Sequence, residues 1–284
     1  MMTPAWRFTL ARRTSQLLVL TLFIGTARWG WTIGGEPILS GTLSASKLLG
    51  IIPLSDPLAL LERLCAGILP AAPALLGAAI VLGLYALLGS RTFCGWICPM
   101  NIVVEAAAWC RSKAELPADV IRVPRASRYV VLAASLLASA VTGYAAFELA
   151  SPQALLWRDL VWDSGLAALS VAAAVFALEF ALMKDGWCGR LCPLGAMWSC
   201  VGRAQKHPIV RIGFSPQSCT HCGQCLKVCQ EQQIIRFKTL DTTRRIPTGE
   251  CLNCGRCIAV CEPKALSFEN GWRPPRPVDD RKLN

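Results

Sequence analysis

Residues 219–229 read CTHCGQCLKVC, and residues 251–261 repeat the same spacing as CLNCGRCIAVC. Both stretches have the form C-x2-C-x2-C-x3-C, in which three thiolates bind one [4Fe–4S] cluster and the fourth binds the neighbouring cluster. One cluster is therefore predicted to be held by Cys219, Cys222, Cys225 and Cys261. The other is predicted to be held by Cys251, Cys254, Cys257 and Cys229.

A pair of structural zinc sites is the alternative for these eight cysteines. Such sites usually show two C-x2-C pairs separated by a spacer, whereas this chain has two unbroken runs of four cysteines. The spacing thus favours clusters, and His221 inside the first run is expected to tune a cluster rather than ligate it. We predict an α+β domain of the bacterial dicluster ferredoxin type at residues 203–273, followed by a polar tail at 274–284.

The rest of the chain is strongly apolar. Hydrophobic residues make up 54% of the 284 residues and charged residues only 17%, which indicates a membrane protein with a polar appendage. Four apolar runs, at about 17–33, 71–88, 129–149 and 166–183, approach the ~20 residues that a bilayer-crossing helix requires. We therefore expect an α-helical membrane protein with four transmembrane helices in residues 1–202 and the ferredoxin-type domain at its carboxyl end.

A second cysteine pattern closes each pair of apolar runs. Residues 93–100 read FCGWICPM and residues 187–194 read WCGRLCPL, so the membrane domain is predicted to be a duplicated helix pair. In a helical segment the two cysteines of C-x3-C lie one turn apart on one face. They could bind a further metal centre, act as redox-active thiols, contact a partner, or simply pack at a helix junction. Because the pattern is duplicated, chemistry is favoured, and the candidate redox residues are Cys94, Cys98, Cys188 and Cys192.

The other cysteines do not suggest a disulfide framework. Of fifteen cysteines, eight have cluster spacing and four belong to the repeated C-x3-C-P, and clusters require free thiolates. The remaining three, Cys65, Cys110 and Cys200, fit no pattern and are expected to be small buried apolar residues.

The formal net charge of +11 does not indicate nucleic-acid binding, because no basic motif interleaved with aromatic residues occurs. Positive residues instead gather at the ends of the apolar runs, and six Lys or Arg residues occur in residues 91–128. By the positive-inside rule, both termini and the ferredoxin-type domain are expected on the cytoplasmic side of the bacterial inner membrane, as parts of a multi-pass protein. A basic face also suits an acidic redox partner.

Haem is not expected. The two histidines of the chain, His207 and His221, lie outside the apolar runs, and no C-x-x-C-H motif occurs. Electrons that cross the membrane would therefore use a quinone, a haem-bearing partner or the C-x3-C-P cysteines.

Several of these features together resemble the NapH/MauN family of membrane-bound ferredoxin-type proteins. The resemblance is carried by residues 10–13 (LARR), residues 53–57 (PLSDP), both C-x3-C-P copies and both cluster motifs. It implies a quinol dehydrogenase component that works with an additional iron–sulfur subunit. Electrons would pass between the quinol pool and a haem-bearing or periplasmic redox system, which belongs to nitrate reductase in NapH and to methylamine utilisation in MauN.

Two other functions stay open at this point. A redox maturation factor would use the C-x3-C-P thiols to reduce a metal or a disulfide during assembly of a partner enzyme. A passive membrane anchor for a redox complex would not need the cluster ligands for activity.

The chain also departs from the usual motif, because Gln230 and Glu262 stand where proline commonly follows the fourth cysteine.

Overall fold

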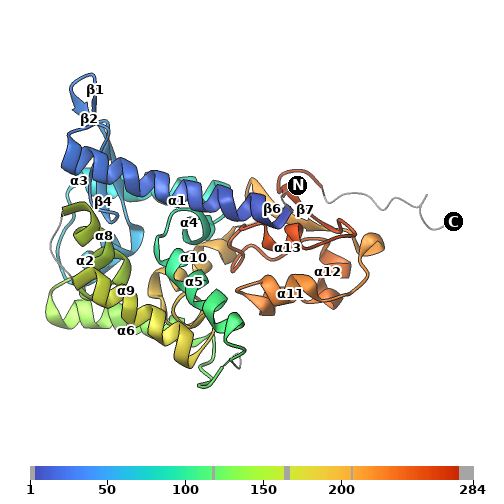
Figure 1. The fold of residues 1–284 in the computed structure, drawn as a ribbon. Helices are drawn as coiled ribbons and strands as arrows, with labels where there is room; N and C mark the ends of the chain where they lie inside the picture. Colours follow the sequence, from blue (N-terminus) through green and yellow to red (C-terminus); the bar gives the residue numbers. More distant parts are fainter. Residues whose placement is uncertain (1–3, 117–118, 163–166, 206, 275–284) are drawn as a thin grey trace. The chain divides into compact units, whose positions relative to one another are not determined.

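The computed structural model describes residues 4–116, 119–162, 167–205 and 207–274. The chain forms two compact units. The cysteine-rich unit combines three stretches of sequence, Met1–Ser15, Tyr85–Ile97 and Trp198–Asn284. The helical unit combines Gln16–Leu84 with Cys98–Met197. Figure 1 shows the elements of both units coloured along the chain, with most helices and strands labelled.

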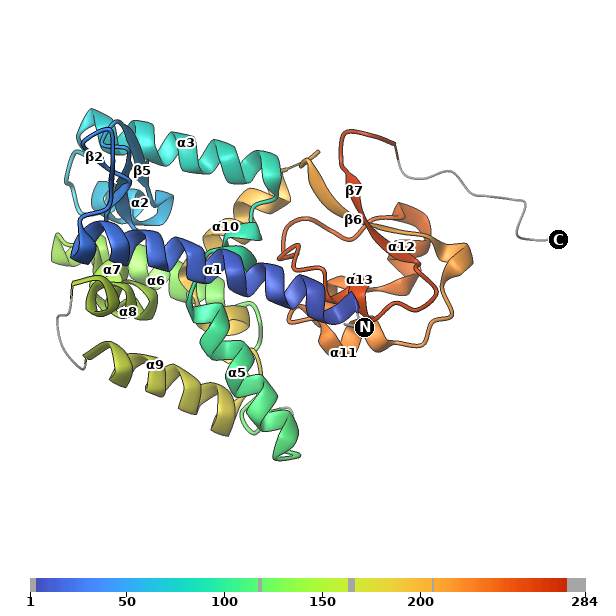
Figure 2. The same cartoon turned by 45° about the horizontal axis from the view of Figure 1, so that its top comes forward.

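A two-stranded antiparallel sheet organises the cysteine-rich unit. β6 (Val210–Phe214) pairs with β7 (Leu266–Asn270), so that Ile212 lies opposite Phe268. Figure 2 shows the two strands side by side. Between them in sequence come η3 (Pro216–Ser218), α11 (Gln224–Val228), η4 (Gln232–Ile234), α12 (Phe237–Thr243) and α13 (Arg256–Ala259). The unit also contains α4 (Thr92–Trp96), the first turns of α1 (Pro4–Trp29) and most of α10 (Pro193–Ala204).

The core of the cysteine-rich unit is built from apolar side chains of the sheet and of the segments around it. Ile212, Phe214, Leu240 and Leu266 are each buried in one continuous cluster of side chains. Burial of a large apolar side chain contributes about 1.5–3 kcal/mol. Cysteines of both motifs belong to the same cluster of side chains, so the fold places them against a dry interior.

The helical unit joins short strands to a group of helices. Its strands are β1 (Thr32–Ile33) with β2 (Glu36–Pro37), and β3 (Leu39–Gly41), β4 (Ala45–Leu48) and β5 (Ile52–Ser55), all antiparallel. Its helices are α2 (Pro57–Cys65), α3 (Ala72–Leu88), α5 (Met100–Lys113), α6 (Ser127–Thr142), α7 (Ala146–Ala150), α8 (Pro152–Trp162), α9 (Ala167–Ala177), η1 (Leu178–Leu182) and η2 (Trp187–Leu191). The ring of Phe23 packs edge-on against the buried Trp157, with centroids 4.6 Å apart.

The expectation of four transmembrane helices is wrong. Among the helices of the described residues, none is both long enough and apolar enough to cross a bilayer. The expected duplicated pair of membrane-spanning helices, with one pair before each C-x3-C-P copy, is not supported either.

This difference arises because the helices end at positions that a count of apolar residues does not reveal. The run at 129–149 is interrupted because α6, of 16 residues, is capped by Gly143 with a left-handed φ of 73°. The run at 166–183 divides into the 11-residue α9 and the π-helical η1. α3 has 17 residues, and the 26-residue α1 contains Arg7, Arg12, Arg13 and Arg28.

Candidate iron–sulfur centres

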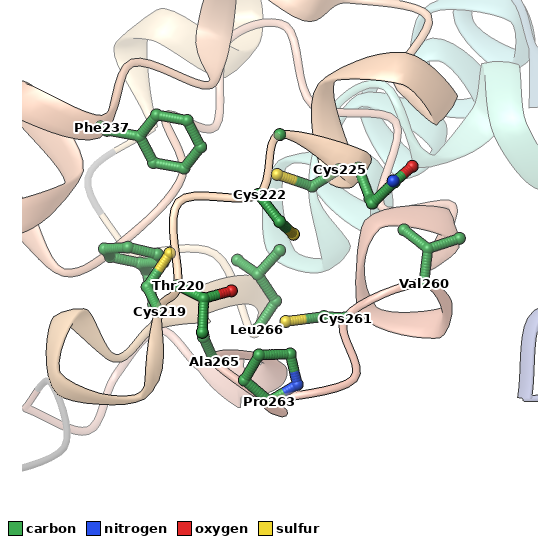
Figure 3. Close-up of a pocket in the computed structure, with 13 residues that line it drawn as sticks. Cys219, Thr220, Cys222, Cys225, Phe237, Val260, Cys261, Pro263, Ala265 and Leu266 are labelled. Atoms are coloured by element: carbon green, nitrogen blue, oxygen red, sulfur yellow. The ribbon is translucent and has the colours of Figure 1, made fainter.

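Two pockets in the cysteine-rich unit are each lined by four cysteines. The first has an empty volume of about 350 Å³ and is lined by Cys219, Cys222, Cys225 and Cys261. Figure 3 shows these four side chains around the pocket. The second has an empty volume of about 370 Å³ and is lined by Cys229, Cys251, Cys254 and Cys257. The last cysteine of each motif thus lines the pocket of the other motif.

The two cysteine loops have the same backbone conformation. Gly223 and Gly255 have φ angles of 73° and 74°, which suit glycine because it has no Cβ. Two residues earlier, His221 and Asn253 also have positive φ angles, of 53° and 50°. These turns direct the amide N–H of His221 toward Cys219 Sγ, at 3.4 Å. Amide donors of this kind stabilise a thiolate and tune a bound cluster.

For the most buried of these thiols, Cys229, Cys251 and Cys257, ionisation is unfavourable without a positive partner. Burial raises the pKa of Cys251 to about 12, although the amide of Asn253 acts in the opposite direction. Burial, followed by the charges of neighbouring thiolates, raises the pKa of Cys229 and Cys257 well above the usual value. A bound metal group reverses this tendency, because a coordinating thiol is deprotonated outright. Four thiols around an apolar pocket therefore fit a positively charged iron–sulfur core.

The surroundings of the two pockets differ. Cys222 in the first motif is exposed, whereas Cys251 and Cys257 in the second are buried. The ring of His221 is stacked on that of Phe237, with centroids 5.0 Å apart. His221 is exposed, and its ring does not line the first pocket. Within the described ranges, no three His, Cys, Asp or Glu side chains come close enough together to hold a single metal ion.

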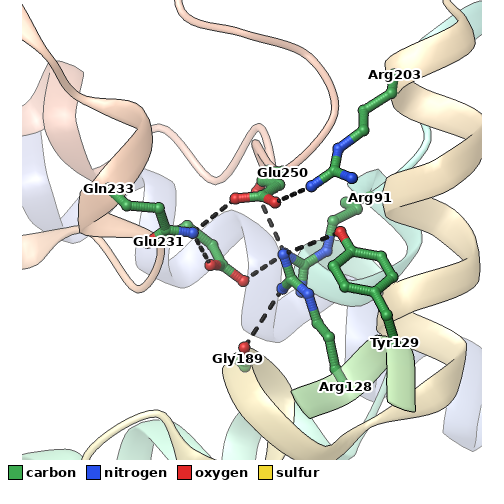
Figure 4. A network of polar contacts seen from close by, with 8 residues as sticks. All are labelled: Arg91, Arg128, Tyr129, Gly189, Arg203, Glu231, Gln233 and Glu250. Atoms are coloured by element: carbon green, nitrogen blue, oxygen red, sulfur yellow. Dashed lines mark hydrogen bonds and ion pairs between the residues drawn. The ribbon is translucent and has the colours of Figure 1, made fainter. Parts of the chain in front are cut away.

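A buried ion pair lies beside the second motif, and the sequence patterns do not reveal it. Arg91 pairs with Glu231, and each side chain is only 1% exposed. Gln233 Nε2 donates to Glu231 Oε2 and to Glu250 Oε2, both at 2.6 Å, and Arg203 pairs with Glu250 at 2.8 Å (Figure 4). Glu231 follows Cys229 by two residues, and Arg91 precedes Cys94 by three. Their closeness in sequence to the cysteine motifs is the feature that could have marked them as residues of the site.

The first part of the first C-x3-C-P copy, up to Ile97, packs on the loop of the second cluster motif. Trp96 Nε1 donates to the carbonyl oxygen of Asn253 at 3.1 Å, and Asn253 Nδ2 donates to Thr92 Oγ1 at 3.2 Å. A Cβ atom on Gly95 would lie 2.9 Å from the carbonyl oxygen of Leu252, so glycine allows this close approach. The half-buried Cys94 is thereby carried on a segment that contacts the second loop.

The remaining C-x3-C-P cysteines belong to the helical unit. Cys98 and Cys192 are buried and Cys188 is half-buried. Pro99 caps the start of α5 and Pro193 begins α10, so each copy is followed directly by a new helix. In the second copy, Glu179 accepts hydrogen bonds from the amides of Gly186 and Trp187 at 3.0 and 2.6 Å. Arg128 donates to the Gly189 carbonyl at 3.4 Å, also drawn in Figure 4.

The cysteines outside the patterns are not all buried. Cys65 and Cys200 are exposed, and Cys110 is half-buried. The expectation that all three are buried packing residues is therefore wrong for Cys65 and Cys200.

Comparison with known proteins identifies both cysteine patterns. A family model described as a 4Fe-4S binding domain matches residues 70–117 and again 164–211, and a 4Fe-4S dicluster domain model matches residues 211–262. The two matches of the first model each contain one C-x3-C-P copy, in agreement with the internal repeat. No solved structure matches the chain.

Named relatives cover most of the chain. The methylamine utilization ferredoxin-type protein MauN of Methylorubrum extorquens is 40% identical over 79% of this chain and 75% of its own length. The ferredoxin-type protein NapH of Escherichia coli is 38% identical over 83% of this chain and 79% of its own length. MauN of Paracoccus denitrificans is 36% identical over 81% of this chain. These relatives confirm the resemblance inferred from the motifs, and the chain belongs to the NapH/MauN family of ferredoxin-type iron–sulfur electron-transfer proteins.

Proposed function

We propose that the chain is an electron carrier in which each cysteine-lined pocket holds one [4Fe–4S] cluster. The ligands would be Cys219, Cys222, Cys225 and Cys261 for the first cluster, and Cys251, Cys254, Cys257 and Cys229 for the second. When bound, each cluster supplies a centre that accepts and releases one electron. The observation that carries this proposal is the gathering of two cysteine quartets, from interleaved motifs, around two pockets of similar volume.

The residues around the pockets would bind the clusters and exclude water. Phe214 and Leu266 line the first pocket, and Ile212 and Ile246 line the second. Apolar walls of this kind lower the local dielectric, so a change of charge on the cluster is felt strongly by nearby groups.

For the physiological route, we propose that the clusters exchange electrons between the quinol pool and a periplasmic redox system. The MauN relatives are named for methylamine utilization, which makes a methylamine dehydrogenase pathway one candidate. The other candidate is periplasmic nitrate reduction, which the motif resemblance associates with the name NapH that two relatives carry. An additional iron–sulfur subunit and a haem-bearing or periplasmic carrier would be the partners. Use of quinol would require a place at the bacterial inner membrane, which protease protection of intact and opened spheroplasts would test.

The cluster proposal is tested by metal analysis of the chain purified without oxygen. Two [4Fe–4S] clusters predict about eight iron atoms and eight acid-labile sulfides per chain, and a paramagnetic resonance signal after reduction. Replacement Cys257→Ser should diminish the second cluster's contribution. The matched control Cys200→Ser removes an exposed cysteine that lines neither pocket, and should leave the iron content unchanged. Stoichiometric zinc without iron would refute the proposal.

The quinol route needs a separate measurement. Mixing the oxidised protein with a reduced quinol analogue should reduce the clusters, which is followed by loss of their visible absorption. Protein with intact clusters that is reduced by dithionite but by no quinol would refute the quinol route and leave the cluster assignment in place.

A further inference from the structure

The two cysteine loops have the same backbone conformation, but only the second loop has another side chain packed on its glycine. A Cβ atom placed on Gly223 in the first loop would meet nothing within 4 Å. A Cβ atom placed on Gly255 in the second loop would lie 2.8 Å from the ring of Phe8. The same ring packs edge-on against Phe268 of β7, with centroids 5.6 Å apart. The first turns of α1 therefore pack on the second loop at Gly255, which is buried.

Arg12 lies one helical turn after Phe8, so both side chains project from the same face of α1. Its side chain is fully buried, with 0% exposure. Burial lowers the pKa of Arg12, while the charge of the Cys254 thiolate acts in the opposite direction. Phe8, on the same face of α1, lies against Gly255, which directly follows Cys254, so the buried guanidinium group of Arg12 lies near the Cys254 thiolate.

Two further arginines surround the same point. Arg256 stands between Cys254 and Cys257 in the sequence, and Arg13 is half-buried beside Arg12. Burial, followed by the charges of Arg12 and Arg13, lowers the pKa of Arg256 to about 9. Positive charges that lie close together repel one another, and negative charge next to them offsets that repulsion.

A cluster held by four thiolates supplies that negative charge. Its core carries fewer positive charges than its four ligands carry negative ones, and reduction adds one more negative charge. A nearby guanidinium group therefore stabilises the reduced cluster more than the oxidised cluster. Burial of the cluster destabilises its reduced form, because a low-dielectric environment disfavours the additional negative charge. Near the first loop, by contrast, the charge of Asp241 acts on Cys219, and that charge is negative.

We propose that Arg12 is a tuning residue of the second [4Fe–4S] cluster, where its positive charge beside Cys254 raises the midpoint potential of that cluster alone. This inference rests on the proposed function, since it requires clusters in both pockets. It assigns to the first turns of α1 a role in setting the electron affinity of one cluster, and it makes the two clusters inequivalent by charge as well as by exposure.

The test is a redox titration of the full chain, followed by paramagnetic resonance under anaerobic conditions. The variant Arg12→Gln should move the midpoint potential of the second cluster to a more negative value and leave that of the first unchanged. The variant Arg12→Lys keeps the positive charge and should restore the wild-type value. Arg7→Gln is the matched control, because it removes one charge from an exposed position of the same helix and should shift neither potential. The variant Cys222→Ser identifies the signal of the first cluster.

Equal shifts of both clusters, a shift confined to the first cluster, or no shift in Arg12→Gln would each refute the role of Arg12 while leaving the proposed function intact. A wild-type protein without iron would refute both. Should Arg12→Gln fail to retain its iron, Arg13→Gln replaces it in the titration. It should then give a smaller shift of the second cluster in the same direction, and an unchanged potential would refute the proposal.

Discussion

The ion pair between Arg91 and Glu231 should determine how firmly the second cluster is held. Both side chains are 1% exposed, and Glu231 lies two residues beyond Cys229, a proposed ligand of the second cluster. Arg91 also donates to the Glu250 carbonyl at 3.3 Å. Replacement Arg91→Met would leave a buried carboxylate without its cation. Removal of one partner of a buried pair typically costs about 3–5 kcal/mol.

The lower end of that range applies here, because Gln233 still donates to Glu231 at 2.6 Å. A cost of about 3 kcal/mol corresponds to about a 100-fold larger population of the locally opened loop, since each 1.4 kcal/mol is a factor of ten. If an iron chelator removes iron from that opened state, the second cluster should be lost about 100 times faster than in the wild type. The first cluster should be lost at its ordinary rate.

The assay follows visible bleaching and the cluster signals during anaerobic incubation with the chelator. The double variant Arg91→Met with Glu231→Leu removes both charges and should recover much of the lost stability, because apolar replacement of a whole buried pair is often neutral. Arg203→Met is the matched control, since Arg203 is 58% exposed in its pair with Glu250 and should cost at most about 1 kcal/mol. Equal rates in wild type and Arg91→Met, or a double variant no better than the single one, would refute this reasoning.

Three further outcomes are expected. In thermal bleaching, Gly255→Ala should destabilise the protein more than Gly223→Ala. Both replacements put a Cβ atom on a left-handed residue, which costs about 1–2 kcal/mol, but only the new Cβ at position 255 also meets the ring of Phe8. Adding Phe8→Ala should rescue only the Gly255 variant, and equal losses without rescue would contradict the contact. Asn253→Ala should lower the stability of the protein by about 1–3 kcal/mol, because the Asn253 amide no longer donates to Thr92 Oγ1 and the Val210 carbonyl oxygen. The same thermal bleaching measures this loss, and an unchanged stability would contradict the role of these two hydrogen bonds. Burial raises the pKa of Asp56 to about 7, so the folded state binds more protons than the unfolded state below that pH. The wild-type melting temperature, followed by circular dichroism, should therefore fall relative to Asp56→Asn as pH rises from 5.5 to about 7, and parallel curves would exclude this titration.

The sequence could predict which cysteines lie together because the motif is local and its cross-over rule is geometric. Spacing alone groups Cys261 with the first motif and Cys229 with the second, and the pockets have the same grouping. The family also followed from the motifs, because both cysteine patterns are specific, and relatives that cover most of the chain are named MauN and NapH.

The membrane spans could not be predicted correctly from apolar runs. A helix ends where backbone conformation changes, and Gly143 at φ 73° stops α6 within a run that remains apolar beyond it. Hydrophobicity averages over such a residue, since glycine contributes little to it. Arg28 interrupts the apolar run at 17–33, and in the structure its guanidinium group donates to the carbonyl oxygens of Val161 and Asp159.

The environment of the second cluster could not be predicted because it depends on residues far apart in the chain. Phe8 contacts Gly255, Trp96 contacts Asn253 and Arg91 contacts Glu231, and no local pattern couples such distant positions. All three contacts converge on the second motif or on the residues just beyond Cys229. The segments around residues 8 and 91–96 therefore complete the second site, whereas the first loop presents Cys222 to solvent and leaves Gly223 uncovered. Under the proposed function, the more exposed first cluster would be the point of contact with a second iron–sulfur protein. The potential of the second cluster would be set by residues of this chain such as Arg12.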